Sequence, residues 1–139
     1  MADSPVASTL IDTVAWVHIE HGRILCGRPR GKDVFFIPGG KREGAESDLQ
    51  TLVREIREEL TIELLPETVV PAGSYEAFAH GPAGGPLVRM ACYTAEYRGT
   101  LAASSEIEAL AWFGYADRGL VPPVDQLLFD DLHTAGRLH

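Results

Sequence analysis

Three glutamates, Glu55, Glu58 and Glu59, have a spacing that brings carboxylates together on one side of a helix. Residues three and four apart are neighbours on a helix surface, and like charges there repel by about 0.2 to 0.5 kcal/mol per pair. A hard cation reverses the sign of that interaction, because carboxylate oxygens are preferred ligands of Mg²⁺ and Mn²⁺. Mg²⁺ also keeps coordination positions for water and substrate phosphate. The spacing therefore favours a metal-dependent reaction at a phosphate group.

The helix that carries these acids is indicated by its hydrophobic periodicity. Its apolar residues follow the i, i+3, i+4, i+7 rule and form one stripe: Leu49, Leu52, Val53, Ile56 and Leu60. A glycine-rich turn, Pro38-Gly39-Gly40, precedes the helix and would let a backbone carbonyl approach an ion closely. The alternative is an ordinary solvated helix face in which Arg54 pairs with Glu58. That alternative leaves the clustered acids and the glycine turn unexplained.

The order of these residues resembles the signature of the Nudix hydrolases, and the chain is most similar to the MutT-like members. The positions in register are Gly40, Glu46, Arg54, Glu55, Ile56, Glu58, Glu59 and Ile62. One position departs, because the family pattern has glycine where this chain has Thr61. A residue with positive φ often closes the last helical turn at this place, and a β-branched residue resists that conformation. We therefore expect any difference at the helix end rather than in the metal chemistry.

The resemblance implies a fold, a cofactor and a catalytic set. The fold is an α/β class structure, the family's α/β/α sandwich with a mixed sheet, and the cofactor is Mg²⁺ or Mn²⁺. The implied catalytic set is Glu46, Arg54, Glu55, Glu58 and Glu59, and the implied metal ligands are Gly40, Glu55, Glu58 and Glu59. Glu55 is our first choice of general base, with Glu59 or an acid outside the motif as alternatives. Arg54 is expected to orient a carboxylate and to pair with Glu46.

Further site residues are suggested outside the motif. Glu106 resembles the loop acid that supplies an extra metal ligand in members that cleave nucleoside triphosphates, with Glu108 and Glu96 as alternatives. Arg28 is expected to contact substrate phosphate or base. Asp125 resembles in position a base-reading residue of MutT-like members, although an aspartate after prolines at a helix start is also a good N-cap.

The remaining aromatic and sulfur-containing side chains are expected to be structural. Trp16, Trp112, Phe35 and Phe36 are predicted to lie in the core rather than to stack on a base. The two cysteines, Cys26 and Cys92, are predicted to be buried and reduced, because each lies in an apolar, strand-like stretch.

Composition limits the classes of partner. The chain has 139 residues and a formal net charge of -8, so we expect one domain over residues 1–139 that does not bind a nucleic-acid polymer. No apolar run is long enough to span a membrane, and Met1 to Thr9 lack the pattern of a signal segment. We expect a cytoplasmic protein with a small-molecule nucleotide substrate, either a monomer or a homodimer.

Strand and turn signals place the acidic helix within a mixed α/β chain. Strands are predicted at residues 12–20, 23–26, 33–37, 69–79, 87–97 and 109–115, with turns at 21–22 and 29–32. The segments 69–79 and 87–97 are expected to form a hairpin, and a second helix is expected over residues 124–138.

The sequence thus predicts a Nudix-type nucleotide pyrophosphohydrolase. The expected substrate is a nucleoside triphosphate or a related nucleoside diphosphate derivative, and an oxidised purine nucleotide is one candidate. An ADP-ribose or dinucleoside-polyphosphate pyrophosphatase is an alternative, disfavoured because Ala77 and the segment 78–80 stand where those members carry a proline and a tyrosine. A catalytically silent nucleotide-sensing module is also an alternative, disfavoured because the motif glutamates are all present.

Overall fold

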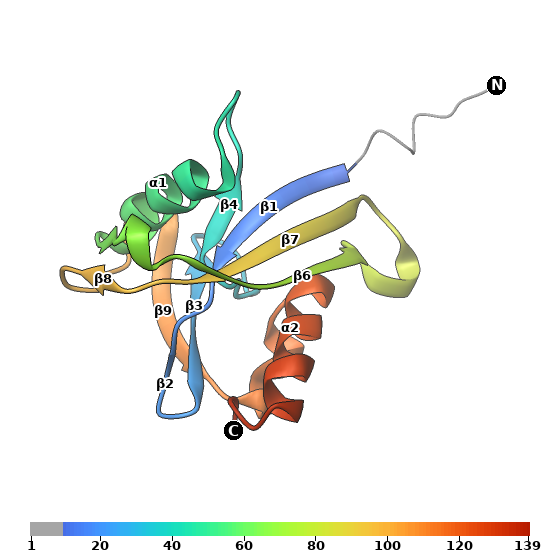
Figure 1. Cartoon of the computed structure of the whole chain (residues 1–139). Coiled ribbons are helices and arrows are strands. Elements are labelled where there is room, and N and C mark those ends of the chain that lie inside the picture. The colour runs from blue at the N-terminus through green and yellow to red at the C-terminus, as the bar shows by residue number, and fades with distance from the viewer. Residues whose placement is uncertain (1–9) are drawn as a thin grey trace.

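The strands of the protein form a mixed sheet and a smaller antiparallel sheet, with α1 and α2 on opposite sides (Figure 1). The computed structural model describes residues 10–139. The mixed sheet has the order β4-β1-β7-β6, made of β4 (Gly39–Lys41), β1 (Leu10–Trp16), β7 (Leu87–Thr94) and β6 (Val70–Phe78). Its β1 and β7 are parallel and its other neighbours antiparallel. The expectation of a mixed sheet is therefore confirmed.

The second sheet has the order β2-β3-β9, with β2 (Ile19–Glu20), β3 (Arg23–Pro29) and β9 (Ile107–Phe113). A short pair, β5 (Glu63–Leu64) and β8 (Tyr97–Arg98), lies beyond the end of α1. The helices are α1 (Asp48–Leu60) and α2 (Pro123–Thr134), and three short 3₁₀ turns cover Pro66–Thr68, Gly81–Ala83 and Tyr115–Leu120.

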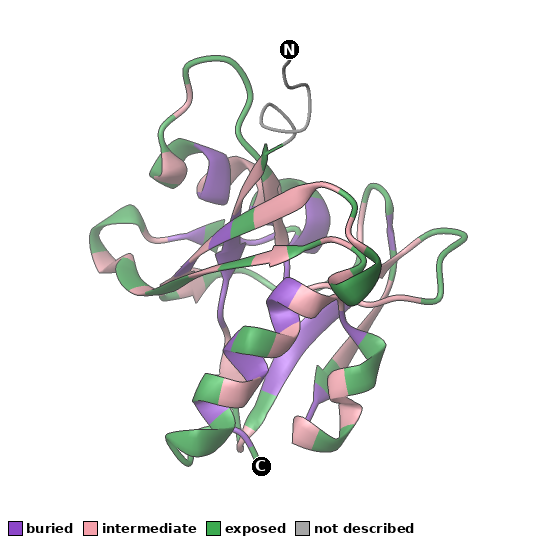
Figure 2. Cartoon of the chain, turned by 90° about the vertical axis from the view of Figure 1, so that its right-hand side faces the viewer, coloured by how far each residue is buried: buried purple, intermediate pink, exposed green. Residues whose placement is uncertain are grey.

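Strand β1 separates two cores because its side chains alternate between the two faces of the sheet. Val14 and Trp16 belong to the cluster under α1, which includes Leu52 and Ile56. Ala15 on the opposite face belongs to the cluster under α2. Buried and exposed residues alternate around α2, as expected for a helix with one face on a sheet (Figure 2). This arrangement fixes α1, and with it the clustered acids, against β1 and β4.

Several predicted elements are confirmed, and others need correction. The acidic helix and the hairpin of β6 with β7 are present, and both cysteines are buried and free. The predicted strand at 33–37 is wrong: this segment is a loop with one isolated bridge, between Phe36 and Gly27. The predicted strand at 12–20 is interrupted between Trp16 and Ile19, and the second helix ends at Thr134. The interpretation of Met1 to Thr9 lies outside the described residues.

Candidate active site

Helix α1 begins and ends with capping interactions that define its first and last turns. The hydroxyl of Ser47 accepts from the Gln50 amide at 3.1 Å, and the Ser47 amide donates to Gln50 Oε1 at 2.9 Å. This reciprocal capping box satisfies two amides that a helix start otherwise leaves unpaired. At the other end Thr61 adopts the left-handed conformation with φ of 60°, despite its branched side chain. Its hydroxyl donates to the Thr100 carbonyl at 3.0 Å, which helps to hold it there.

Glu55, Glu59 and Glu106 form an acidic cluster, in which one carboxylate oxygen from each lies within 4.8 Å of the others. Glu55 and Glu59 lie one helical turn apart on α1, while Glu106 comes from the loop before β9. Glu59 is 7% exposed, and burial, followed by repulsion from Glu55, raises its pKa to about 8. Burial also raises the pKa of Glu55. Hard oxygen donors at this density can hold a divalent cation, which would favour their ionised forms.

The two glycines before the helix allow β4 to approach this cluster. A side chain at Gly39 would collide with the Val14 carbonyl, and one at Gly40 would collide with the Glu55 carboxylate. The Gly39 amide donates to Glu59 Oε1 at 3.3 Å. The close approach therefore requires glycine at position 39, whereas a side chain at position 40 would displace the Glu55 carboxylate, so the backbone of the predicted metal ligand Gly40 lies beside the acidic cluster.

Arg54 connects the glycine turn with the acidic face of α1. Its Nε donates to Glu46 Oε2 at 2.7 Å, and its Nη2 donates to Glu46 Oε1 at 2.9 Å. This bidentate contact is the largest cause of the lowered pKa of Glu46, which falls to about 2. Arg54 Nη1 lies 3.4 Å from carboxylate oxygens of both Glu55 and Glu58. Glu58, a predicted metal ligand, is half exposed on this side and is not one of the three clustered acids.

A cavity of about 740 Å³ begins at the acidic cluster and extends between the sheets toward α2. Its wall includes Gly40, Glu59 and Glu106 at one place and the apolar side chains of Val88 and Met90 at another. A cavity of this size with mostly apolar walls and a few polar groups is typical of a small-molecule site.

Asp125 lies in the wall of this cavity and is 3% exposed. Its Oδ2 accepts from the Ile37 amide at 2.9 Å, and burial raises the pKa of the carboxyl to about 7. The alternative that Asp125 caps α2 is wrong, because Pro122 occupies the N-cap position and no side chain bonds there. Asp125 instead stands within the first helical turn and turns its carboxyl inward.

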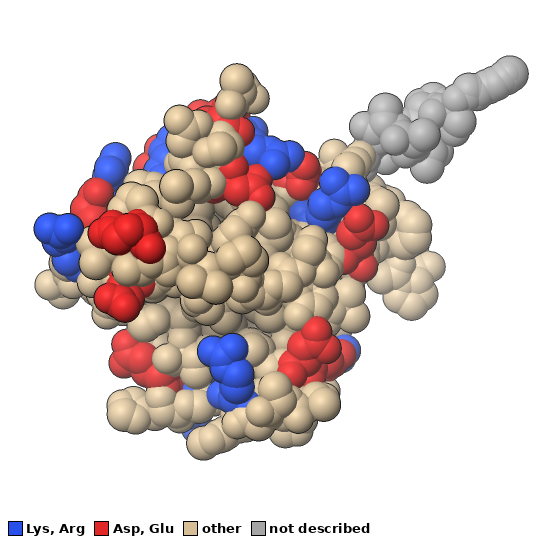
Figure 3. All heavy atoms as spheres, in the orientation of Figure 1, with Lys and Arg blue, Asp and Glu red and all other residues tan. Residues whose placement is uncertain are grey.

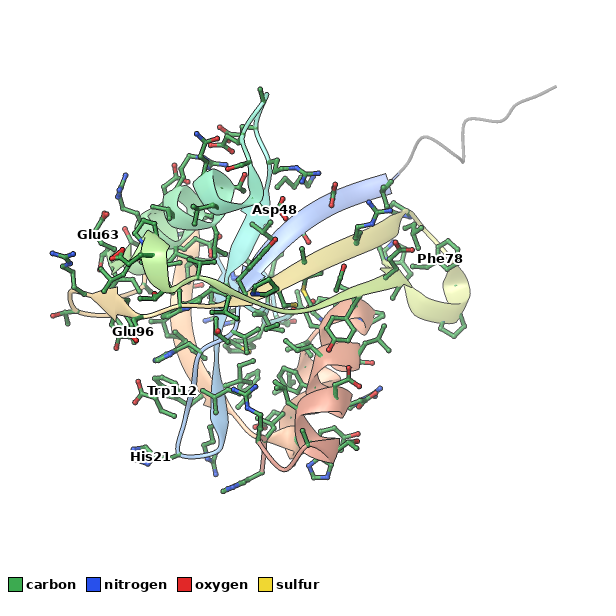
Figure 4. The ribbon with its side chains drawn as sticks, in the orientation of Figure 1. His21, Asp48, Glu63, Phe78, Glu96 and Trp112 are labelled. Carbon is green, nitrogen blue, oxygen red and sulfur yellow. The ribbon has the colours of Figure 1, made fainter. Side chains whose placement is uncertain are left out.

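The side chain of Arg28 does not line the cavity. Its Nη1 donates to Glu108 Oε1 and to the Lys32 carbonyl, both at 3.1 Å, and its guanidinium lies 6.0 Å from the centroid of the Phe35 ring. Glu108 is thereby paired outside the acidic cluster. Glu96 is also outside that cluster, on the side of the molecule that carries β8 (Figure 4).

The aromatic predictions had mixed outcomes, and some cavity residues were missed. Trp16 is fully buried as predicted, whereas Trp112 is 37% exposed at the surface of β9. Phe36 lines the cavity. Lys32 and His80 also line it, and nothing in the sequence pattern singled them out, because the cavity joins loops that are distant in the chain.

A family model described as the NUDIX domain matches residues 10–129. The chain belongs to the Nudix hydrolase family. It is 36% identical over 108 residues to the CTP pyrophosphohydrolase of Escherichia coli (strain K12), covering 74% of this chain and 75% of that protein. The predicted enzyme class, a Nudix-type nucleotide pyrophosphohydrolase, is thereby confirmed.

Solved structures agree with this Nudix assignment. The E. coli ORF135 protein superposes with a TM-score of 0.70 at 31% identity, covering 95% of this chain and 97% of that one. A NUDIX hydrolase from Nitrosomonas europaea has the same fold, with a TM-score of 0.71 at 21% identity over 93% and 91% of the two chains. The predicted Nudix fold class is confirmed.

The charge distribution on one face and the lengths of the helices can be compared with the expected class of partner. On the face in Figure 3, Lys and Arg side chains are interspersed with Asp and Glu side chains rather than gathered into one basic patch. Within residues 10–139, no helix is both long and apolar enough to cross a membrane.

Proposed function

We propose that this Nudix hydrolase is a divalent-metal-dependent enzyme that cleaves a phosphoanhydride bond of a nucleoside triphosphate or a related nucleoside diphosphate derivative. The observation that carries the proposal is the acidic cluster of Glu55, Glu59 and Glu106, two of whose members, Glu59 and Glu106, line a nucleotide-sized cavity. Glu59 is almost fully buried, and its neighbours in the cluster are further carboxylates. Such a group needs a cation if it is to be charged at neutral pH, and its oxygen donors fit Mg²⁺ or Mn²⁺.

The residues around the cluster suit phosphoryl substitution. A bound divalent cation lowers the pKa of a water and draws charge from phosphate oxygens. Glu59 and Glu106, with the Gly40 carbonyl, would hold the cation, and Glu55 is the proposed proton acceptor. A bound cation would favour the ionised form of Glu55, and a general base must be deprotonated before it can accept the proton of a water. Arg54 keeps the Glu55 carboxylate in place while Glu46 holds Arg54.

The substrate proposal rests on the cavity and on the named relative. A relative called CTP pyrophosphohydrolase supports a nucleoside triphosphate as the substrate, and CTP is the first candidate. The apolar cavity wall and the buried Asp125 would receive the base. An oxidised purine nucleotide remains in the proposal as the second candidate, since a buried carboxyl can also accept from the ring hydrogens of a guanine.

A substrate panel tests this function. CTP, other triphosphates, oxidised guanine nucleotides, ADP-ribose, dinucleoside polyphosphates and nucleotide sugars are assayed with Mg²⁺ and with Mn²⁺, and the released phosphate and pyrophosphate are quantified. We expect a nucleoside monophosphate and pyrophosphate from a triphosphate. Preferred cleavage of ADP-ribose or a dinucleoside polyphosphate would overturn the substrate proposal. No turnover of any compound would favour a silent nucleotide-sensing module.

A further inference from the structure

The turn after β3 carries a cationic side chain to the wall of the cavity. Lys32 lines the cavity, whereas Arg28 does not. The turn is closed by the Lys32 amide, which donates to the Pro29 carbonyl at 3.2 Å. Gly31 has φ of 75° in the third position of this turn, where a positive φ favours glycine. Arg28 Nη1 donates to the Lys32 carbonyl at 3.1 Å and so fixes the end of the turn.

The same turn is attached to the loop that supplies Glu106. The Arg30 amide donates to the Glu106 carbonyl at 2.8 Å, so the backbone on which Lys32 stands is held beside the acidic cluster. Among residues 10–139, no carboxylate forms an ion pair with Lys32. Lys32 is thus an exposed cation without an ion-pair partner of its own, in a cavity lining that also includes Glu59 and Glu106.

This charge has a use in the proposed reaction. A nucleoside triphosphate is strongly anionic, and the acidic cluster by itself repels it. An ammonium group on a flexible stem is well suited to contact phosphate oxygens, because its three donors can follow the phosphate chain without a fixed bidentate geometry. Lys41 also lines the cavity, but it belongs to the glycine turn beside the acidic helix, where its carbonyl accepts from Arg54 Nη2 at 3.3 Å.

We propose that Lys32 binds the phosphate chain of the substrate and that Arg28 is a positioning residue that acts through the Lys32 turn. This inference rests on the proposed function. The phosphate contact predicted for Arg28 is thus proposed for Lys32 instead. Arg28 fixes the backbone of Lys32 through its bond to the Lys32 carbonyl.

Steady-state kinetics with CTP and Mg²⁺ test the proposal in Lys32→Gln and in the matched control Arg30→Gln. Arg30 is an exposed cation of the same turn that does not line the cavity, and only its backbone amide makes the contact to Glu106. We expect Lys32→Gln to raise KM by about five- to tenfold with kcat within about twofold, the pattern of a lost binding contact. Arg30→Gln should change KM by less than about twofold, since an exposed charge outside the site contributes little. The Lys32 effect should shrink at high salt.

Binding of the α,β-methylene analogue of CTP in the presence of Mg²⁺, measured by calorimetry, gives a second readout that does not need turnover. Lys32→Gln should lower the affinity for the analogue, and Lys32→Arg should retain part of the affinity that Lys32→Gln loses. Arg28→Gln should weaken it less, and the double variant should match Lys32→Gln alone, because a residue that acts only through another adds nothing once its target is gone.

The outcomes separate the two proposals. Turnover by the wild type with equal KM values in Lys32→Gln and Arg30→Gln overturns the role of Lys32 and leaves the proposed function standing. Additive effects of Arg28→Gln and Lys32→Gln overturn the positioning role of Arg28. Absence of both turnover and analogue binding in the wild type, across the triphosphates of the panel, overturns the proposed function and this inference with it.

Discussion

The carboxylate of Glu55 lies where a side chain at residue 40 would stand: a Cβ added to Gly40 would collide with Glu55 Oε2. The glycine turn and the acidic helix are therefore packed against each other at the atoms that the proposed chemistry uses. Without a side chain, Gly40 leaves its backbone exposed to the carboxylate. This explains in physical terms why a glycine and a glutamate fifteen residues apart belong to one motif.

Replacement of Glu59 tests the acidic cluster. We expect Glu59→Gln to stay folded, since its amide oxygen can still accept from the Gly39 amide. Turnover should fall by on the order of 10² to 10³, the loss typical of one major electrostatic contact in a transition state. Glu58→Gln is the control variant, because Glu58 is half exposed and is not one of the three clustered acids. Its turnover should fall by less than that of Glu59→Gln. Equal losses would place Glu58 in the site on the same footing as Glu59.

Metal binding should be visible in thermal unfolding. An ion that binds only the native state stabilises it by about 2.7 kcal/mol at a concentration a hundredfold above its Kd. Millimolar Mg²⁺ or Mn²⁺ should therefore raise the Tm of the wild type. The Glu55→Gln/Glu59→Gln double variant should lose this response, whereas Glu96→Gln, outside the cluster, should keep it. An equal response in all three proteins would place the ion elsewhere.

The metal-free protein should lose stability as the pH rises toward 8. The folded pKa of Glu59 is about 8, whereas an unfolded glutamate titrates at about 4.3, so between these values the folded state binds more protons. The stabilising contribution is complete below the unfolded pKa and is lost as the pH rises through the folded one. Urea titrations in EDTA from pH 5 to 8 measure the free energy of unfolding as a function of pH. Glu59→Gln should show a flatter dependence, and an unchanged slope would contradict the raised pKa.

The local sequence pattern was sufficient to predict the acidic helix, because the stripe of Leu52, Ile56 and Leu60 lies close in sequence to the glycine turn. The contacts that complete the site join residues that are far apart in the sequence. Glu106 joins the cluster from the loop before β9, and only the family resemblance predicted its role as a metal ligand. The bond from Ile37 to Asp125 joins residues 88 apart, which no periodicity reveals.

Thr61 illustrates how a local rule can be overridden. The left-handed conformation costs a residue with a Cβ about 1 to 2 kcal/mol, and the bond to Thr100 returns about 0.5 to 1.5 kcal/mol. We expect Thr61→Gly to unfold within about 1 kcal/mol of the wild type, since these terms offset each other. Thr61→Val keeps the branch and loses the hydroxyl, so it should be the less stable of the two. Urea denaturation compares them, and higher stability for Thr61→Val would contradict the role of the hydroxyl.

Asp125 gives the sharpest test of base recognition, because its cap role has been excluded. Asp125→Ala leaves the buried Ile37 amide without its acceptor, and this should cost about 1 to 3 kcal/mol of stability. Asp125→Asn can still accept from that amide through its side-chain oxygen, so its stability should stay closer to that of the wild type. Its outward donor and acceptor pattern differs, however, and a base that contacts it would meet a changed partner.

We therefore expect Asp125→Asn to alter the ratio of kcat/KM between CTP and guanine nucleotides by tenfold or more, the order of discrimination that about 1.4 kcal/mol gives. A purely structural Asp125 predicts a common change for every nucleotide, because a loosened cavity wall does not distinguish bases. The measurement is kcat/KM for each nucleotide in the wild type and both variants. An unaltered ratio in Asp125→Asn would leave Asp125 as the buried anchor of the Ile37 loop and move base recognition to the apolar wall.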